Sequence, residues 1–184
     1  MGKIENAMQQ HLVISAIGRD RPGLLKELSG TILDSGCHIE DSRMVLLGAE
    51  FAILLIASGS WSAVAKLEAM LPALKQRLDL AVLSKRTESR PSNHKLMPYA
   101  VEAISLDQPN IVHELAYFFA SRNITIEELS TRRYPALHTG APLFSVSFII
   151  HLPVDLSIAI LREQFMELCD NLNLDAILEP IRGR

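Results

Sequence analysis

Apolar residues follow two spacings along this chain, and the order in which the spacings change occurs twice. Runs rich in β-branched residues predict strands, whereas apolar residues three and four positions apart predict amphipathic helices. The first half contains six such segments: a strand over residues 11–18, a helix from Pro22 to Ser35-Gly36, strands over 37–47 and 51–57, a helix after Ser60 or Ser62 that extends to Leu78, and a strand over 80–83. The predicted order is therefore βαββαβ.

The second half repeats this order. At an offset of 87 residues, Asp20 falls on Asp107 and Glu40 falls on Glu127. The predicted elements of this half are strands over residues 99–105, 124–133, 143–151 and 174–179 and helices over 109–121 and 156–172. The last helix matches the first half only at an offset of 94, so seven residues are inserted. The long hairpin loop 134–142 is their predicted place.

An internal repeat of this length indicates two domains. We predict an α+β chain with a first domain over residues 1–86, a linker over 87–97 and a second domain over 98–184. Each domain should have an antiparallel sheet with two helices on one face. Pro72 lies inside a predicted helix, where proline removes a backbone donor and clashes with the preceding turn. A kink, or a break into two shorter helices, is therefore expected near residues 70–71.

The two halves differ in the pattern of one central strand. Residues 144–150 alternate between apolar residues and Ser145 or Ser147, as expected when one sheet face meets water. Residues 51–56 are apolar at every position, so the second face of that sheet is apolar as well. The other half, a second copy of the chain or a partner protein should cover it.

Composition narrows the class of protein. The 184 residues are 48% hydrophobic, but the longest apolar run, residues 51–57, is far shorter than the ~20 residues of a membrane helix. The N-terminus lacks an apolar signal core, and Cys37 and Cys169 occur singly, which favours a reducing cytoplasm. A net charge of −3 gives no general attraction to nucleic acid.

Motifs of catalysis are missing from the sequence. It contains no nucleophile elbow, P-loop, GxGxxG or HExxH motif, and its six histidines lack the spacing of metal ligands. We therefore predict no enzymatic activity, no cofactor and no metal.

The segment between the first strand and the first helix, Asp20-Arg21-Pro22-Gly23-Leu24-Leu25, has two interpretations. In the local one, Asp20 caps the helix, and Pro22 occupies its first position. In the functional one, free backbone N–H groups and the positive helix end receive a ligand carboxylate, and Asp20 pairs with its ammonium group. The residues alone weight the two interpretations about evenly.

Residues 18–25, with Ile17 before them and Gly36 after the helix, resemble the ACT domain, a βαββαβ amino-acid-sensing module with a ferredoxin-like fold. The doubled arrangement resembles a bacterial family of tandem ACT proteins that repress the glycine cleavage operon. The segments that carry this second resemblance are residues 13–51, 134–136, 138–140, 161–175 and 179–180.

The resemblance implies a cytoplasmic regulator without catalytic activity or a DNA-binding domain of its own. Such a protein restrains a DNA-binding transcriptional activator by contact, and glycine relieves the restraint. Its ligand would bind Asp20, Arg21, Pro22, Gly23, Leu24 and Leu25, with Cys37, His38 and Ile39 as a second wall between modules. The equivalent residues of the second module are Asp107, Asn110, Ile111 and Val112, with Asn110 in place of the glycine. The expected partners are a small amino acid, the activator and a second copy of the chain, without direct nucleic-acid or membrane contact.

Other functions fit the same βαββαβ order. RNA recognition needs exposed aromatic residues on the central strands, but Met44, Val45, Ala52 and Leu54 stand there. An acylphosphatase would use an arginine of the first loop, for which Arg19 and Arg21 are correctly placed, although the second module has neither. An ACT-type allosteric subunit of a metabolic enzyme is the remaining alternative.

Overall fold

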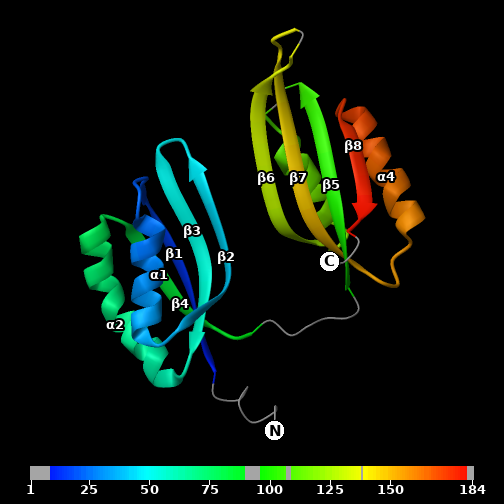
Figure 1. Cartoon of the computed structure of the whole chain (residues 1–184). Coiled ribbons are helices and arrows are strands. Elements are labelled where there is room, and N and C mark those ends of the chain that lie inside the picture. The colour runs from blue at the N-terminus through cyan, green and yellow to red at the C-terminus, as the bar shows by residue number, and fades with distance from the viewer. Residues whose placement is uncertain (1–8, 90–95, 107–108, 138, 182–184) are drawn as a thin grey trace. The chain divides into compact units, whose positions relative to one another are not determined.

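A computed structural model of the chain describes residues 9–89, 96–106, 109–137 and 139–181 (Figure 1). The chain divides into two compact units, Met1–Pro91 and Ser92–Arg184. The elements of the first unit are β1 (Gln10–Arg19), α1 (Leu24–Ser35), β2 (His38–Leu47), β3 (Glu50–Gly59), α2 (Trp61–Leu78) and β4 (Ala81–Thr87). Those of the second are β5 (Leu96–Leu106), α3 (Ile111–Ala120), β6 (Thr125–Pro135), β7 (Pro142–Pro153), α4 (Ile158–Asn171) and β8 (Asp175–Pro180).

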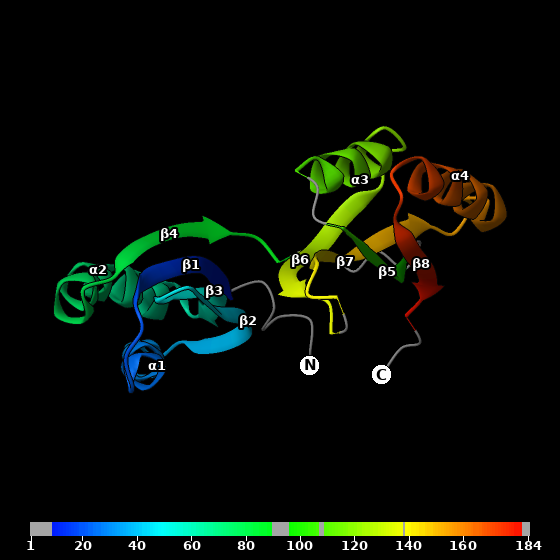
Figure 2. The same cartoon turned by 90° about the horizontal axis from the view of Figure 1, so that it is seen from above.

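The two units have the same topology. Their antiparallel sheets have the strand orders β2-β3-β1-β4 and β6-β7-β5-β8. Figure 1 shows α1 and α2 on one side of the first sheet, and Figure 2 shows α3 and α4 on one side of the second. The predicted fold of two tandem ferredoxin-like βαββαβ domains is confirmed.

The core of the first unit lies between its sheet and its helices. Leu12, Ile14 and Ala16 occupy alternate positions of β1 and are fully buried, because strand side chains alternate between the two sheet faces. Helix α1 covers this face with residues three and four positions apart, among them Leu28 and Ile32. Val13 and Ile17 of β1 point to the opposite face, away from α1 and α2, the described helices of this unit (Figure 1).

The core of the second unit is built around aromatic rings. Phe119 and Phe165 come from the two helices, and their ring centroids lie 5.8 Å apart. Phe148 of β7 lies 6.0 Å from Phe119, and Phe118 lies 5.6 Å from Phe165. Three of these rings stand where the first unit has aliphatic side chains, and Phe118 stands at the position of Thr31.

Helix α2 is continuous across Pro72. The predicted break into two shorter helices is therefore wrong. A proline removes one intrahelical hydrogen bond, but Leu71 and Leu74 on either side of it are buried in the core. Tertiary packing on both sides of the proline holds the helix together.

The segment between the units differs from the predicted linker at both ends. Thr87 belongs to β4, and β5 begins at Leu96, so these residues and Met97 lie in strands rather than in a linker over 87–97. Residues 90–95 of the predicted linker are outside the described residues.

The seven inserted residues are divided between two places. In the strand register, Arg19 lies opposite Glu50 in the first sheet, and its equivalent Leu106 lies opposite Leu143 in the second. The offset between equivalent residues is therefore 87 before the hairpin, from Arg19 to Leu106, and 93 after it, from Glu50 to Leu143. The hairpin loop therefore holds six extra residues. The seventh lies between β7 and α4.

Candidate functional site

The ligand turn, which comprises residues Asp20 to Leu25, connects β1 to α1. Gly23 is the N-cap of α1, and its φ of 94° is left-handed, which glycine adopts without steric cost. Apart from its chain neighbours, no atom lies within 4 Å of the place that a Cβ of Gly23 would occupy, so only the backbone conformation requires glycine there.

The helix begins at Leu24, two residues later than predicted. The left-handed Gly23 separates Pro22 from the helix, and the N-cap has no side-chain hydrogen bond. The predicted helix start at Pro22 is therefore wrong, and of the two interpretations left open for the segment, the local one in which Asp20 caps the helix is not observed. Asp20 instead donates its backbone N–H to the carbonyl of Ala49, 3.0 Å away, which ties the turn to the β2–β3 hairpin.

The first turn of α1 has the electrostatics of an anion site. The Leu24 N–H donates to the Arg21 carbonyl at 3.4 Å and the Glu27 N–H to the Gly23 carbonyl at 3.0 Å. Between them, the N–H groups of Leu25 and Lys26 have no helical carbonyl four residues earlier to accept them. The helix dipole adds partial positive charge at this end. Leu24 is buried, whereas Leu25 is 46% exposed. The turn therefore offers N–H donors beside an apolar side chain, which suits a small carboxylate.

The residues that were expected to form a second wall lie elsewhere in the first unit. In the strand register, Arg19, next to the ligand turn, lies opposite Glu50 at one end of β3. His38 lies opposite Ser58, near the other end of β3. The buried Cys37 and the partly exposed Ile39 flank His38. The structure therefore does not bring Cys37, His38 and Ile39 together with the ligand turn within one unit.

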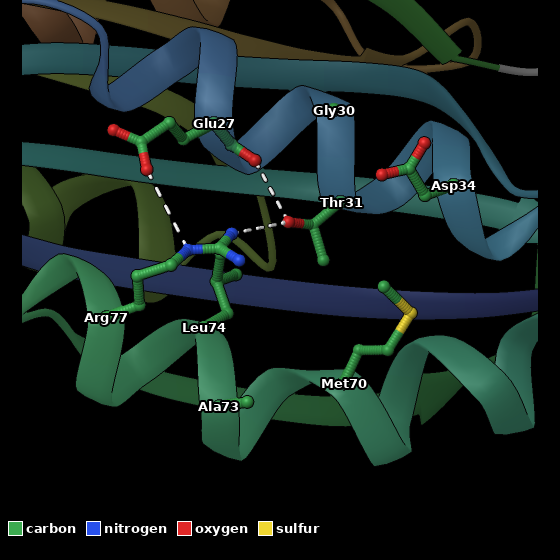
Figure 3. A pocket seen from close by; sticks show the side chains of 8 residues that line it. All are labelled: Glu27, Gly30, Thr31, Asp34, Met70, Ala73, Leu74 and Arg77. Carbon is green, nitrogen blue, oxygen red and sulfur yellow. Dashed lines mark hydrogen bonds and ion pairs between the residues drawn. The ribbon is translucent and has the colours of Figure 1, made fainter.

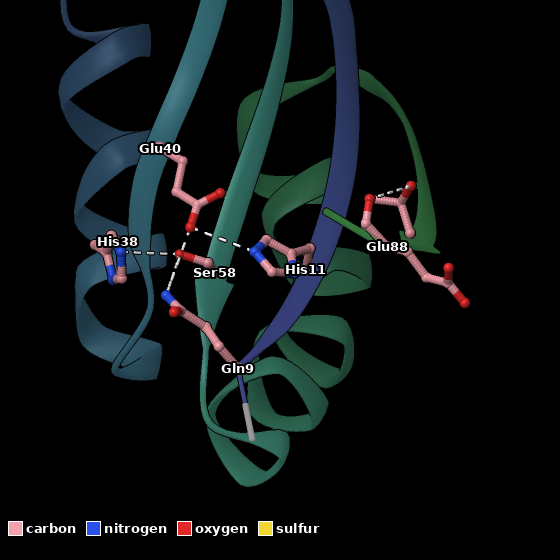
Figure 4. A network of polar contacts seen from close by, with 7 residues as sticks. Gln9, His11, His38, Glu40, Ser58 and Glu88 are labelled. Atoms are coloured by element: carbon pink, nitrogen blue, oxygen red, sulfur yellow. Dashed lines mark hydrogen bonds and ion pairs between the residues drawn. The ribbon is translucent and has the colours of Figure 1, made fainter. Parts of the chain in front are cut away.

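His38 belongs instead to a network of polar contacts across β1, β2 and β3 (Figure 4). The fully buried Ser58 contacts His38 Nε2 at 2.9 Å through its hydroxyl, which also accepts a hydrogen bond from Gln9 at 3.1 Å. On the same surface, His11 Nε2 lies 3.4 Å from a carboxylate oxygen of Glu40. The network links three strands at one end of the sheet.

Glu40 has a counterpart in the second unit. The strand register skips Glu40 in β2 and Glu127 in β6, so both carboxylates sit on a β-bulge. A carboxylate oxygen of Glu127 lies 3.2 Å from Nδ1 of His151. The repeat alignment of Glu40 with Glu127 marked these positions, but the partners His11 and His151 come from different strands of the two units. The sequence alone could not pair them.

The second module's equivalent of the ligand turn has a different backbone. Asn110 is the N-cap of α3 with a φ of −99°, so it does not adopt the left-handed conformation of Gly23. Ile111 is buried, and Val112 is half-buried against the core. Asp107 lies outside the described residues.

A hollow of about 300 Å³ lies on the open face of the second sheet. The hydroxyl groups of Ser130, Ser145 and Ser147 line it together with Glu102 and Arg132. Sequence analysis marked Ser145 and Ser147 only as solvent-facing positions, because their neighbours in the hollow come from two other strands, β5 and β6.

The thiol of Cys169 is poorly suited to chemistry. Burial raises the pKa of Cys169 to about 11, with a further contribution from the carboxylate of Asp170. The thiol is therefore protonated near neutral pH, whereas the thiolate is the nucleophile and metal ligand. Among the described residues, no three His, Cys, Asp or Glu side chains form a group that could hold a metal ion. None of the described helices is long and apolar enough to span a membrane.

Comparisons with known proteins agree with these features. The profile of the ACT domain family matches residues 10–84. The glycine cleavage system transcriptional repressor of Escherichia coli (strain K12) is 34% identical over 173 residues, which cover 94% of this chain and 91% of that protein. The repressor of Shigella flexneri matches equally well.

Solved structures extend the similarity to both units. A crystal structure that carries the provisional name of a glycine cleavage system transcriptional repressor has a TM-score of 0.74 and 31% identity, and the match covers 95% of this chain and 99% of that one. An unknown protein from Galdieria sulphuraria has a TM-score of 0.75 over the same shares of the two chains. Its identity of 24% shows the fold alone.

The fold of the two units and the match to the ACT domain profile define a protein with tandem ACT domains. Within this class, the chain belongs to the family of glycine cleavage system transcriptional repressors. Members with this name are regulators, and the chain is accordingly not an enzyme.

Proposed function

We propose that the chain represses expression of the glycine cleavage system in the cytoplasm by contacting a DNA-binding activator, and that glycine relieves this contact. The observation that carries the proposal is the 34% identity to a repressor of this name over 94% of the chain, which includes both units. The net charge of −3 supports contact with a protein rather than with DNA.

The ligand turn is the proposed glycine site. The carboxylate of glycine would accept hydrogen bonds from the free N–H groups at the start of α1, and the carboxylate of Asp20 would receive its ammonium group. Any second wall formed by Cys37, His38 and Ile39 would have to come from another module or another copy, because these residues lie at the far end of their own sheet.

The open face of the first sheet is the proposed contact surface for the activator. It presents exposed apolar side chains from all four strands, namely Ile17, Val45, Leu54 and Leu83. In the second unit, the positions of Leu54 and Val45 are occupied by Ser147 and Arg132. The positions of Ile17 and Leu83 keep exposed isoleucines, Ile104 and Ile177, so the apolar face is more extensive on the first sheet. An extensive exposed apolar face is typical of an interaction surface.

Calorimetric titration of the purified full chain with glycine, serine and alanine tests the ligand assignment. We expect saturable, glycine-selective binding that Asp20→Asn weakens without a change in folding. Asp155→Asn is the matched control, because Asp155 is an exposed carboxylate outside the ligand turn. Undiminished glycine binding by Asp20→Asn would show that the ligand turn is not the site.

Co-purification of the chain with the activator of the glycine cleavage genes tests the repressor mechanism. The chain should capture the activator without glycine and release it when glycine is added. Release by glycine from the wild type, but not from Asp20→Asn, would link the site to the partner. Failure to capture the activator at any glycine concentration would contradict the proposed mechanism.

A further inference from the structure

A groove of about 310 Å³ lies between α1 and α2 of the first unit (Figure 3). Thr31 and Leu74 form its floor and are both buried. Gly30 and Ala73 stand in the middle of its two walls, where their small size leaves the space between the helices open.

Gly30 has no local reason to be glycine. It lies in the interior of α1, where glycine is less favourable than alanine. Its φ is not in the left-handed region, and nothing lies within 4 Å of the place that a Cβ would occupy. A residue that weakens its own helix without a steric cause often marks a functional position. Here its effect is to keep the groove open.

One end of the groove holds the Arg77 guanidinium beside the Glu27 carboxylate, and the other end holds the Asp34 carboxylate. At one end, the Arg77 guanidinium donates from Nη2 to the hydroxyl of Thr31 at 3.3 Å, and its Nε lies 3.8 Å from Oε2 of Glu27. At the other end is the exposed side chain of Asp34, while Lys66 donates to the backbone carbonyl of Asp34 at 2.7 Å. Figure 3 shows the Arg77 and Asp34 groups separated along the groove.

The related helices of the second unit do not offer the same groove. Tyr117 stands at the position of Gly30, and Glu167 stands at that of Ala73. Arg122, two residues after the end of α3, also donates two hydrogen bonds to Gln164 of α4, at 2.9 and 3.1 Å. The small centre and the charged ends are therefore features of the first unit and not of the fold.

We propose that this groove binds a small zwitterion, with its carboxylate on Arg77, its ammonium group on Asp34 and its carbon chain over the gap between Gly30 and Ala73. Guanidinium and carboxylate groups are the usual protein partners of these two charges. A purely anionic ligand would leave Asp34 unmatched, and a purely cationic one would leave the remaining donors of Arg77 unused. This site is separate from the ligand turn, and it does not depend on the function proposed for that turn.

NMR titration of the isotopically labelled full chain locates binding. The probes are glycine, β-alanine, 4-aminobutyrate and 5-aminopentanoate, which carry the same two charges at increasing separation. We expect the amide signals of Gly30 and Thr31 to shift with at least one probe, with saturation below about 1 mM, a weak but specific affinity. Acetate and methylammonium, which carry one charge each, should not shift them.

Two variants, each with a control on the same helix, identify the features of the groove that bind the probe. Gly30→Leu fills the groove, and Ser29→Leu adds the same side chain to α1 at a position that does not line it. Arg77→Gln removes the positive charge, and Lys75→Gln removes a charge from the same helix outside the groove. Gly30→Leu and Arg77→Gln should weaken binding of the best probe at least about tenfold, or about 1.4 kcal/mol, whereas the two controls should not.

The outcomes separate this site from the ligand turn. Shifts at Gly30 and Thr31 that persist in Asp20→Asn and disappear in Arg77→Gln support the groove. Two results would overturn the proposal: no probe shifts these amides below ~10 mM, or the shifts survive both Gly30→Leu and Arg77→Gln. Binding of glycine at the ligand turn, with no probe shifting the amides of Gly30 and Thr31, would leave the proposed function intact while excluding the groove.

Discussion

Nη1 of Arg21 lies 3.1 Å from Oε1 of Glu27, and this contact joins the ligand turn to the wall of the helix groove. The second oxygen of the same carboxylate lies 3.8 Å from Nε of Arg77. Glu27 therefore stands between two guanidinium groups, one from the ligand turn and one from α2. The ligand turn and the groove therefore share one contact residue, Glu27, which pairs with a guanidinium group of each.

Glu27→Gln should remove both ion pairs at a small cost in stability. The partners are between 36% and 59% exposed, and exposed pairs contribute roughly 0.2–1 kcal/mol each. Urea denaturation at about 0.05 M and 1 M salt measures the effect, which should shrink at high salt because the charges are screened. Glu167→Gln, an exposed change on α4, is the control. A loss above ~2 kcal/mol that is insensitive to salt would contradict this account.

Two glycines of the same segment should respond to alanine in opposite directions. Gly23→Ala forces a Cβ into a left-handed conformation and should destabilise the chain by about 1–2 kcal/mol. Gly30→Ala has space for its methyl group in a helix interior and should stabilise it by about 0.5–1 kcal/mol. The urea denaturation midpoints of the two variants, compared with that of the wild type, measure the two changes in stability. Changes of the same sign would show that one of the two backbone conformations is wrongly assigned.

The fold could be predicted from the sequence because apolar spacing and repetition determine it. The strict alternation around Ser145 and Ser147 predicted the buried face of β7, and Val146 and Phe148 are indeed buried. The start of α1 could not be predicted in the same way. Pro22 suits a first helical residue, but the φ of Gly23, which no pattern reveals, places the proline outside the helix.

The candidate site was less accessible to sequence reasoning. The ligand turn is one continuous segment, so its motif could identify it. The groove depends on residues of two helices about 40 positions apart, such as Gly30 and Ala73, and only packing shows that they face each other. The same holds for the contact between His11 and Glu40, which crosses an intervening strand.

Stability should decline in the alkaline range because of Cys169. Burial raises the pKa of its thiol from an ordinary value of 9.0 to about 11, so the folded state holds the proton more tightly than the unfolded state. This contribution is complete below pH 9 and is lost as the pH rises toward 11. Urea denaturation between pH 8 and pH 11 should show that the free energy of unfolding falls with pH less steeply in Cys169→Ala than in the wild type. An identical slope in the variant would mean that other groups cause the decline.

A substitution on the open face of the first sheet tests partner binding. The residue to introduce is the one that the second unit has at the equivalent position. Leu54 is 53% exposed on β3, and Ser147 occupies its position on β7. Leu54→Ser should therefore leave the free energy of unfolding within about 0.5 kcal/mol of the wild type, as surface changes usually do. Capture of the activator should fall, because the change places a hydroxyl in an apolar contact.

Leu33→Ser provides the control for that experiment, because Leu33 is an even more exposed leucine, at 73%, on α1. Normal capture by Leu33→Ser and reduced capture by Leu54→Ser would assign the contact to the open face rather than to apolar exposure in general. Sedimentation of each variant alone distinguishes the other occupants of this face. If Leu54→Ser changes the mass or the compactness of the free chain while capture is unchanged, the face packs against a second copy or the other unit, and the activator binds elsewhere.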